Sequence, residues 1–283
     1  MRTFALALAL TLALPLAAPA ADKPAAEAPI NAGPYVPSPQ SVVADMLKLA
    51  EIGPQDFVID LGSGDGRIVL TAAKVFGASG FGVEIKDELV KLSNEAAKKE
   101  GVADRVKFIK ADLFKTDISR ATVLTMYLLP NTVNMLKDKL LTELRPGTKV
   151  LSHDYPLSGW VPEKYVQWDL EDKVQISGVT TTLIYLYMVP AKVQGNWRAT
   201  VPASVVKGPL SLALKQQVTR LAGSAKLDGK EVALDELKIR GTQISFTLPA
   251  KKAAFTGTVK DGTIEGTVSA GGATAPWSAQ LAK

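Results

Sequence analysis

The sequence predicts an α/β fold with a mostly parallel sheet, followed by a C-terminal antiparallel β-rich domain. Apolar runs of strand length alternate with amphipathic helical segments through the first two thirds of the chain. This alternation ends near Pro190. Alternating apolar and polar residues then surround two hairpin-turn dipeptides, Asp228-Gly229 and Asp261-Gly262. These patterns are typical of βα units and of hairpins, respectively.

Glycine, proline and capping residues bound the elements of the α/β part. Ser38 and Pro39 favour a helix start with Ser38 as the N-cap, and Gly77 and Gly101 favour helix ends. Repeated βα units predict parallel strands with right-handed crossovers. The predicted strands are 57–61, 80–85, 106–110, 121–128 and 148–152, and the predicted helices are 40–51, 67–76, 87–100 and 132–144.

After the fifth strand the pattern changes from βα units to strands. Gly178 separates two predicted strands with no full helix between them, which predicts a hairpin at the end of the sheet. The remainder predicts an antiparallel meander or half-barrel, with Trp197 and Trp277 in its core. The predicted strands in these regions are 166–174, 181–189, 243–248, 254–259 and 263–268.

The N-terminus has the layout of a bacterial secretory signal peptide. Arg2 precedes an apolar run from Phe4 to Leu14, and Ala18-Pro19-Ala20 is a small-residue cleavage pattern. We therefore expect cleavage after Ala20 and a periplasmic or secreted protein. The run is shorter than the roughly 20 residues of a membrane span, although an uncleaved anchor stays open. Residues 21–33 form an Ala/Pro-rich spacer.

Composition excludes several classes of function. The chain has no cysteine, which excludes disulfides, thiolate chemistry and a lipoprotein anchor. One histidine and no cysteine give no metal-site pattern. The net charge is only +5 and no basic run is present, so the composition disfavours nucleic-acid binding.

A glycine-rich turn carries the strongest functional signal. Gly62, Gly64 and Gly66 follow a predicted strand, open a predicted helix and are preceded by Asp60. Glycines allow a sharp turn and close approach of the backbone to a ligand. A dinucleotide fingerprint would require glycine or alanine at position 67, where the chain has Arg67. A tight turn without a ligand is the structural alternative.

Two acidic residues follow the next two strands. Glu84 ends the second strand 18 positions after Gly66, where a carboxylate can accept the ribose hydroxyls of a nucleotide. Asp112 follows the third strand. Each acid alone is typical of a solvated loop residue, but at the carboxyl ends of neighbouring parallel strands they favour a ligand site.

The pattern from Asp60 to Gly66 resembles motif I of the class I methyltransferases. The resemblance implies a Rossmann-like seven-strand methyltransferase sheet that binds S-adenosyl-L-methionine. It implies that Asp60 and the loop surround the amino-acid end of the cofactor, and that Asp112 accepts the adenine amino group. The cofactor-binding residues implied are Tyr35, Asp60, Gly62, Ser63, Gly64, Gly66, Glu84, Ile85, Asp112 and Leu113.

A narrower resemblance involves the segments 60–69 and 35–39. Together they are similar to mitochondrial seven-strand lysine methyltransferases and their bacterial relatives, and segment 82–89 resembles the Dot1-type lysine methyltransferases. These families imply methylation of a protein lysine. The resemblance covers residues 34–190, the expected methyltransferase domain, and leaves 193–283 as an accessory domain.

Tyr127 and Asp154 are the predicted catalytic residues. Tyr127 lies at the end of the fourth predicted strand, where we expect the acceptor, and the alternative is a core aromatic residue. Asp154 follows His153 after the fifth strand; such a pair can serve as a base or be structural. Tyr35 is expected to close over the cofactor. No Asn-Pro-Pro-Tyr motif is present, which argues against DNA adenine methylation.

The sequence leaves the methyl acceptor open. A protein is the expected partner, and the C-terminal domain is a candidate for contact with the cell envelope. A different class of function also stays open: an exported binding or assembly protein that keeps the fold without catalysis. The set of Asp60, the loop glycines and Glu84 favours a working cofactor site.

Overall fold

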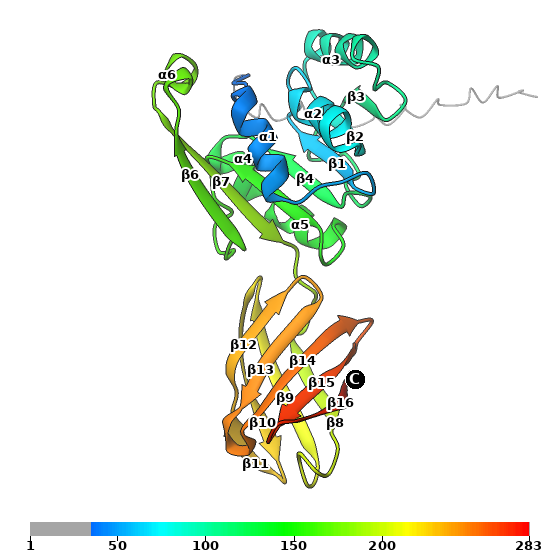
Figure 1. The fold of residues 1–283 in the computed structure, drawn as a ribbon, viewed down its shortest axis with the longest axis vertical. Helices are drawn as coiled ribbons and strands as arrows, with labels where there is room; N and C mark the ends of the chain where they lie inside the picture. The colour runs from blue at the N-terminus through cyan, green and yellow to red at the C-terminus, as the bar shows by residue number, and fades with distance from the viewer. Residues whose placement is uncertain (1–34, 283) are drawn as a thin grey trace, which may run out of the picture. The chain divides into compact units, whose positions relative to one another are not determined.

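The computed structural model describes residues 35–282, so the predicted signal peptide and spacer lie outside the described residues. Figure 1 shows two sheets in this part of the chain, one accompanied by helices and one built from strands. Within the described residues, no helix has both the length and the apolar character needed to cross a membrane.

The first sheet confirms the predicted α/β fold. Its seven strands lie in the order β3-β2-β1-β4-β5-β7-β6. All neighbouring strands are parallel except β7, which is antiparallel to β5 and β6. The predicted terminal hairpin is therefore present. The strands are β1 Phe57–Leu61, β2 Ser79–Glu84, β3 Val106–Lys110, β4 Val123–Met126, β5 Lys149–His153, β6 Lys164–Asp169 and β7 Thr181–Met188.

Amphipathic helices supply the apolar side chains that pack on this sheet. On α1, Val42, Val43, Met46 and Leu47 are buried and pack in one core cluster with strand residues such as Val58. This pattern follows helical spacing, as the sequence predicted. The helices are α1 Gln40–Leu49, α2 Arg67–Phe76, α3 Asp87–Lys99, α4 Pro130–Met135, α5 Lys137–Glu143 and α6 Glu171–Ser177.

The predicted helix 132–144 is wrong in one respect, because it is two short helices, α4 and α5, separated at Leu136. Val133, Leu136 and Leu140 are all fully buried at helical spacing. The apolar period continues across the break, so the sequence pattern gave no sign of it.

The predicted strand 166–174 is also wrong beyond Asp169, because α6 occupies Glu171–Ser177. An acidic residue, Glu171, stands in the first turn, and Gly178 ends the helix with a left-handed backbone at φ 77°. Both are ordinary helix-boundary signals. The apolar residues of this segment alternate as they do in a strand, and that pattern predicted a strand where the chain forms a helix.

The C-terminal sheet is antiparallel and nearly barrel-shaped. Its order is β11-β10-β9-β8-β16-β15-β14-β13-β12, in which every hydrogen-bonded pair is antiparallel. Trp197 and Trp277 are both buried in its core, as predicted. The strands are β8 Gly195–Thr200, β9 Leu210–Gln217, β10 Arg220–Leu227, β11 Lys230–Ala233, β12 Asp235–Arg240, β13 Gln243–Leu248, β14 Ala253–Lys260, β15 Thr263–Ala270 and β16 Ala273–Leu281.

Side chains fill the interior of this second sheet. Phe246 stacks on Phe255 with ring centroids 4.7 Å apart, and Trp277 meets both rings edge-on. Edge-to-face aromatic contacts of this kind stabilise a core beyond area burial alone.

Candidate functional site

The strand order reverses between β1 and β4, which is where ligands bind in open α/β sheets. Asp60 of β1 and Thr125 of β4 are direct neighbours in register, and Thr125 Oγ1 donates a 2.7 Å hydrogen bond to Asp60 Oδ1. Asp60 is 2% exposed. Burial raises the pKa of Asp60 to about 7, even though the hydrogen bond from Thr125 opposes this shift. A cationic ligand group would therefore find a carboxylate ready to ionise.

The glycine-rich loop needs its glycines. Gly62, Gly64 and Gly66 have φ values of 77°, 54° and 81°, a region that costs other residues about 1–2 kcal/mol. A Cβ at Gly62 would lie 2.7 Å from Leu128 Cδ2, and one at Gly64 would collide with the ring of Tyr35. Tyr35 therefore lies against the loop, although 39% of its surface is exposed.

Glu84 at the end of β2 fixes the loop in place. Its carboxylate accepts hydrogen bonds from three backbone N–H groups, those of Gly64 (3.0 Å), Ile85 (2.8 Å) and Lys86 (2.9 Å). A carboxylate has about four acceptor positions, so one remains for a ligand hydroxyl. Glu84 thus organises the loop as well as offering the predicted ribose contact.

A chain of polar contacts connects the loop to β5. Arg67 forms a bidentate ion pair with Asp65, with its shortest contact 2.5 Å, and its Nη1 donates to the Ser38 carbonyl at 2.6 Å. Ser38 Oγ lies 2.8 Å from His153 Nδ1. The predicted N-cap role of Ser38 is therefore wrong: Pro39 occupies the N-cap position, and the Ser38 hydroxyl bonds to His153 instead.

The residues predicted to bind the base lie at the ends of β2 and β3. Ala111 N donates to the Glu84 carbonyl at 3.1 Å, which brings these ends together. Asp112 Oδ1 accepts from Phe114 N at 2.8 Å. Ile85 is 40% exposed, and Leu113 packs in a core cluster of the first sheet.

The loop's geometry fits the amino-acid end of S-adenosylmethionine. Ser63 Oγ is buried and has no hydrogen-bond partner in the described part of the chain. Buried hydroxyls rarely stay unpaired, so this atom is suited to a ligand. The Gly64 backbone carries no side chain of its own, and the Tyr35 ring lies against it. Asp60 would hold the cofactor's ammonium group, and Glu84 its ribose.

On the acceptor side, Tyr127 and Asp154 are in direct contact. Tyr127 Oη donates to Asp154 Oδ2 at 2.8 Å. Asp154 also accepts from the Leu183 backbone N–H at 3.0 Å and from Lys173 Nζ at 2.7 Å to each oxygen. Burial would raise the pKa of Asp154, but His153 and these donors lower it below its ordinary value. A carboxylate held ionised by four contacts is a weak base, and the catalytic role of Asp154 stays a prediction.

The two side chains of the predicted His153–Asp154 pair are close together but do not form a hydrogen bond. His153 has no exposed surface, and its Nε2 lies 3.6 Å from Asp154 Oδ1, too far for a hydrogen bond. Burial lowers the pKa of His153 to about 4. Its ring stacks on the Tyr127 ring with centroids 3.9 Å apart. His153 is thus a neutral residue that supports Tyr127.

The surroundings of Tyr127 are compatible with its predicted place on the acceptor side of the site. Burial raises the pKa of Tyr127, and its hydrogen bond to Asp154 raises it further. The hydroxyl therefore keeps its proton and points it at Asp154. Its oxygen lone pairs remain available to accept a hydrogen bond from an N–H group.

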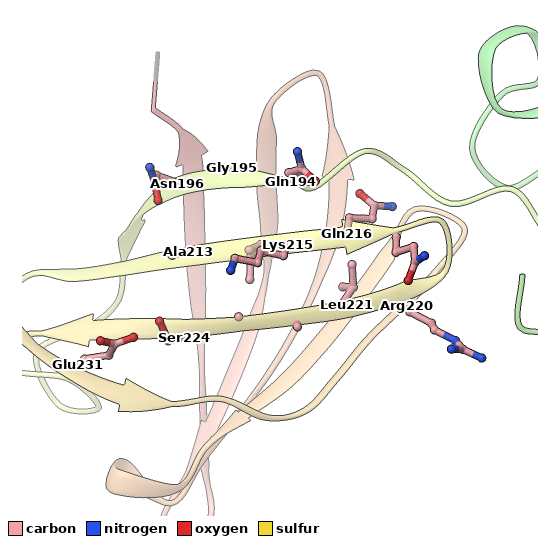
Figure 2. Close-up of a pocket in the computed structure, with 14 residues that line it drawn as sticks. Gln194, Gly195, Asn196, Ala213, Lys215, Gln216, Arg220, Leu221, Ser224 and Glu231 are labelled. Atoms are coloured by element: carbon pink, nitrogen blue, oxygen red, sulfur yellow. The ribbon is translucent and has the colours of Figure 1, made fainter. Parts of the chain in front are cut away.

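Figure 2 shows a separate open groove on the C-terminal sheet. It has a volume of about 1010 Å³. Its lining comes from β8 to β11 and the segments next to them, including Gln194, Lys215, Arg220 and Glu231. None of the predicted cofactor or catalytic residues lines it. Among the described residues, no group of three acidic or histidine side chains forms a metal site.

Sequence reasoning missed three residues that shape the site: Thr125, Arg67 as an ion-pair partner, and Lys173. Thr125 was detectable as a lone polar residue in the apolar run Val123–Met126. Lys173 carried no such signal, because its burial depends on α6 folding against Asp154.

Comparison with known proteins identifies this arrangement. Residues 60–164 match the family model described as the ANTKMT methyltransferase domain. A protein-lysine N-methyltransferase from Saccharolobus islandicus (strain REY15A) is 45% identical over 157 residues, which cover 55% of this chain and 93% of the relative. The adenine nucleotide translocase lysine N-methyltransferase of Mus musculus is 35% identical over 129 residues. That match covers 46% of this chain and 56% of the relative, so the chain spans little more than half of the mouse enzyme.

A solved structure of a methyltransferase is also similar to this chain. It is an RNA methyltransferase from Salinibacter ruber in complex with S-adenosyl-L-homocysteine, 44% identical, with a TM-score of 0.50. The match covers 56% of this chain and 96% of that one. With the sheet order, the glycine loop and the 45% identity to the archaeal enzyme, this chain belongs to the class I S-adenosylmethionine-dependent methyltransferase family that includes that enzyme.

Proposed function

We propose that this methyltransferase acts on the side-chain amine of a protein lysine. The observation that carries the proposal is the Tyr127 hydroxyl, whose proton is committed to Asp154 at 2.8 Å. An acceptor amine brings N–H donors and needs an oxygen acceptor to orient it. The lysine specificity named for the Saccharolobus and mouse relatives supports the same acceptor.

The chemistry requires a neutral, aligned amine. When bound, S-adenosylmethionine supplies a methyl group activated by a sulfonium. Lysine has a reference pKa near 10.4, so the acceptor must first lose a proton to water. Partial burial beside Tyr127 disfavours the charged form of the amine. The Tyr127 oxygen then orients the lone pair while the carbon–sulfur bond breaks and the carbon–nitrogen bond forms.

A direct assay tests the acceptor. Residues 21–283 are incubated with methyl-labelled S-adenosylmethionine and either poly-L-lysine, poly-L-arginine or unstructured RNA. We expect label on poly-L-lysine, recovered as methyllysine after hydrolysis, and a loss of about tenfold or more with Tyr127→Phe. Label on RNA alone, the acceptor class in the name of the Salinibacter enzyme, would contradict the proposal.

We also propose that the protein acts outside the cytoplasm and contacts the cell envelope through its C-terminal domain. The signal-peptide layout of residues 1–20 supports export. Residues 193–283 contain twelve Lys and Arg but only six Asp and Glu, which favours an anionic surface. Sedimentation with phosphatidylglycerol vesicles tests the contact: binding should weaken at high salt, and binding that ignores salt would contradict it.

A further inference from the structure

Lys173 is a buried cation that lies beside the acceptor side of the site. It lies on α6, which Figure 1 shows between β6 and β7, and is 1% exposed. Its Nζ donates to both Asp154 oxygens at 2.7 Å and to the Thr181 carbonyl oxygen. Burying an ammonium is costly unless it is paired with a negative charge, and the Asp154 carboxylate supplies that charge for Lys173.

Asp154 in turn depends on Lys173. Asp154 has a left-handed backbone with φ 62°, a conformation that is uncommon for residues other than glycine. Lys173 bridges both carboxylate oxygens, Leu183 N–H occupies Oδ1, and Tyr127 Oη occupies Oδ2. Lys173 and Tyr127 therefore share one oxygen atom, Asp154 Oδ2.

We propose that Lys173 is a positioning residue for methyl transfer. Its ammonium keeps the Asp154 carboxylate ionised, so that Asp154 accepts the hydrogen bond from the Tyr127 hydroxyl and leaves the lone pairs of the Tyr127 oxygen free for the acceptor amine. The proposal rests on the proposed lysine methylation, in which Tyr127 contacts the acceptor. Lys173 itself acts only through Asp154.

The contact between Lys173 and Asp154 predicts how turnover depends on pH. The charged and titratable groups that face Asp154 are Lys173, His153 and Tyr127, and the Tyr185 hydroxyl lies in the field of Asp154. Removing Lys173 takes away one of the contacts that lower the pKa of Asp154 against the effect of burial, so that pKa should rise. A protonated Asp154 would accept the hydrogen bond from the Tyr127 hydroxyl less well. The turnover of such a variant should therefore rise as Asp154 ionises, whereas the wild type shows no such step.

The test compares Lys173→Met with a matched control, Lys164→Met. Lys164 belongs to the neighbouring strand β6 and pairs with Glu51 at 3.1 Å, but both side chains are exposed. Turnover on poly-L-lysine is measured against pH, together with cofactor affinity by calorimetry. For Lys173→Met we expect kcat to fall about tenfold or more at pH 7, cofactor affinity to stay unchanged, and a new ionisation in the pH profile of kcat. Lys164→Met and the charge-preserving Lys173→Arg should lack that ionisation.

Two further measurements keep the inference falsifiable. The double variant Lys173→Met/Asp154→Asn removes the buried charge altogether, so it should fold and show low turnover without the new ionisation. In a Tyr127→Phe background, Lys173→Met should lower kcat only slightly further, because both substitutions act through the contact between Tyr127 and Asp154. Additive losses, or a Lys173→Met profile identical in shape to the wild type, would overturn the inference.

An acceptor-independent signal separates this inference from the proposed function. The ¹³Cζ resonance of Tyr127, assigned by its loss in Tyr127→Phe, should shift in Lys173→Met and stay in place in Lys164→Met. If the wild type methylates no lysine while this shift occurs, the lysine acceptor is wrong and the positioning contact stands. If the resonance does not move, Lys173 does not position Tyr127.

Discussion

Thr125 Oγ1 donates to Asp60 Oδ1 across the two strands at which the order of the sheet reverses. Asp60 is 2% exposed, and among the described residues its one hydrogen-bond donor is this neutral hydroxyl on the neighbouring strand. A neutral donor stabilises the carboxylate less than a cation would. No cation among residues 35–282 forms an ion pair with the Asp60 carboxylate.

The pKa of about 7 at Asp60 predicts how stability and cofactor affinity vary with pH. The folded protein keeps a proton on Asp60 that the unfolded chain releases near pH 4. The free energy of unfolding should therefore fall, on the order of 2–4 kcal/mol, as pH rises from 4 to 7. Cofactor affinity should rise over the same range, because the ionised carboxylate attracts the cofactor's ammonium. Denaturant melts and calorimetry on wild type and Asp60→Asn check both: a pH dependence that survives in Asp60→Asn would rule out Asp60 as its source.

Gly64→Ala should weaken cofactor binding about tenfold or more, because the new Cβ collides with Tyr35 and disturbs the loop. Gly101→Ala is a matched control: Gly101 also has a positive φ, 68°, but a Cβ there meets nothing within 4 Å. Both variants should lose about 1 kcal/mol of stability from backbone strain. Calorimetry should find normal cofactor affinity only in the control, and equal affinities in the two variants would show that the collision is harmless.

His153 predicts a pH effect of the opposite sign. Its folded pKa of about 4 lies below the ordinary 6.5, so the stability it contributes is complete above pH 6.5 and is lost as pH falls toward 4. Ser38→Ala should cost about 1–3 kcal/mol, because it leaves His153 Nδ1 buried without its partner. Melts of His153→Gln between pH 4 and 7 isolate the Asp60 effect from this one. An unchanged acid-side slope in His153→Gln would count against this assignment.

The domain boundary stays a prediction that truncation can test. The buried members of three core clusters all lie before Pro190, whereas those of the fourth begin at Ala191. Residues 21–191 should therefore fold alone and bind the cofactor with normal affinity. Circular dichroism melts and calorimetry are the measurements. An aggregated fragment without cofactor binding would show that residues 34–190 are not an independent domain.

Export makes a chemical prediction about the mature N-terminus. The chain expressed in a Gram-negative host should appear in the periplasmic fraction beginning at Ala21, as read by intact-mass spectrometry. Soluble cytoplasmic protein that retains Met1 would be incompatible with this expectation. A change of Ala20 to a bulky residue should block processing and serves as the control.

The elements that sequence predicted well are those with local causes. Three glycines at every second position determine the turn between β1 and α2, and the bounds of β1 and α2 agree with the predicted ranges. The failures have non-local causes. Ser38 bonds to His153, 115 residues away, and Lys173 reaches Asp154 only after α6 folds back. Patterns of apolar residues report which face is buried but not which distant polar group will satisfy a buried one.

The contacts of residues 35–38 have a practical consequence for anyone handling this protein. Tyr35 lies on Gly64, and Ser38 contacts both Arg67 and His153. The start of the described chain is thus a strap across the catalytic end of the sheet. An affinity tag joined directly to Tyr35, or a protease site cut just after it, would alter the enzyme's chemistry, so purification handles belong at the opposite terminus.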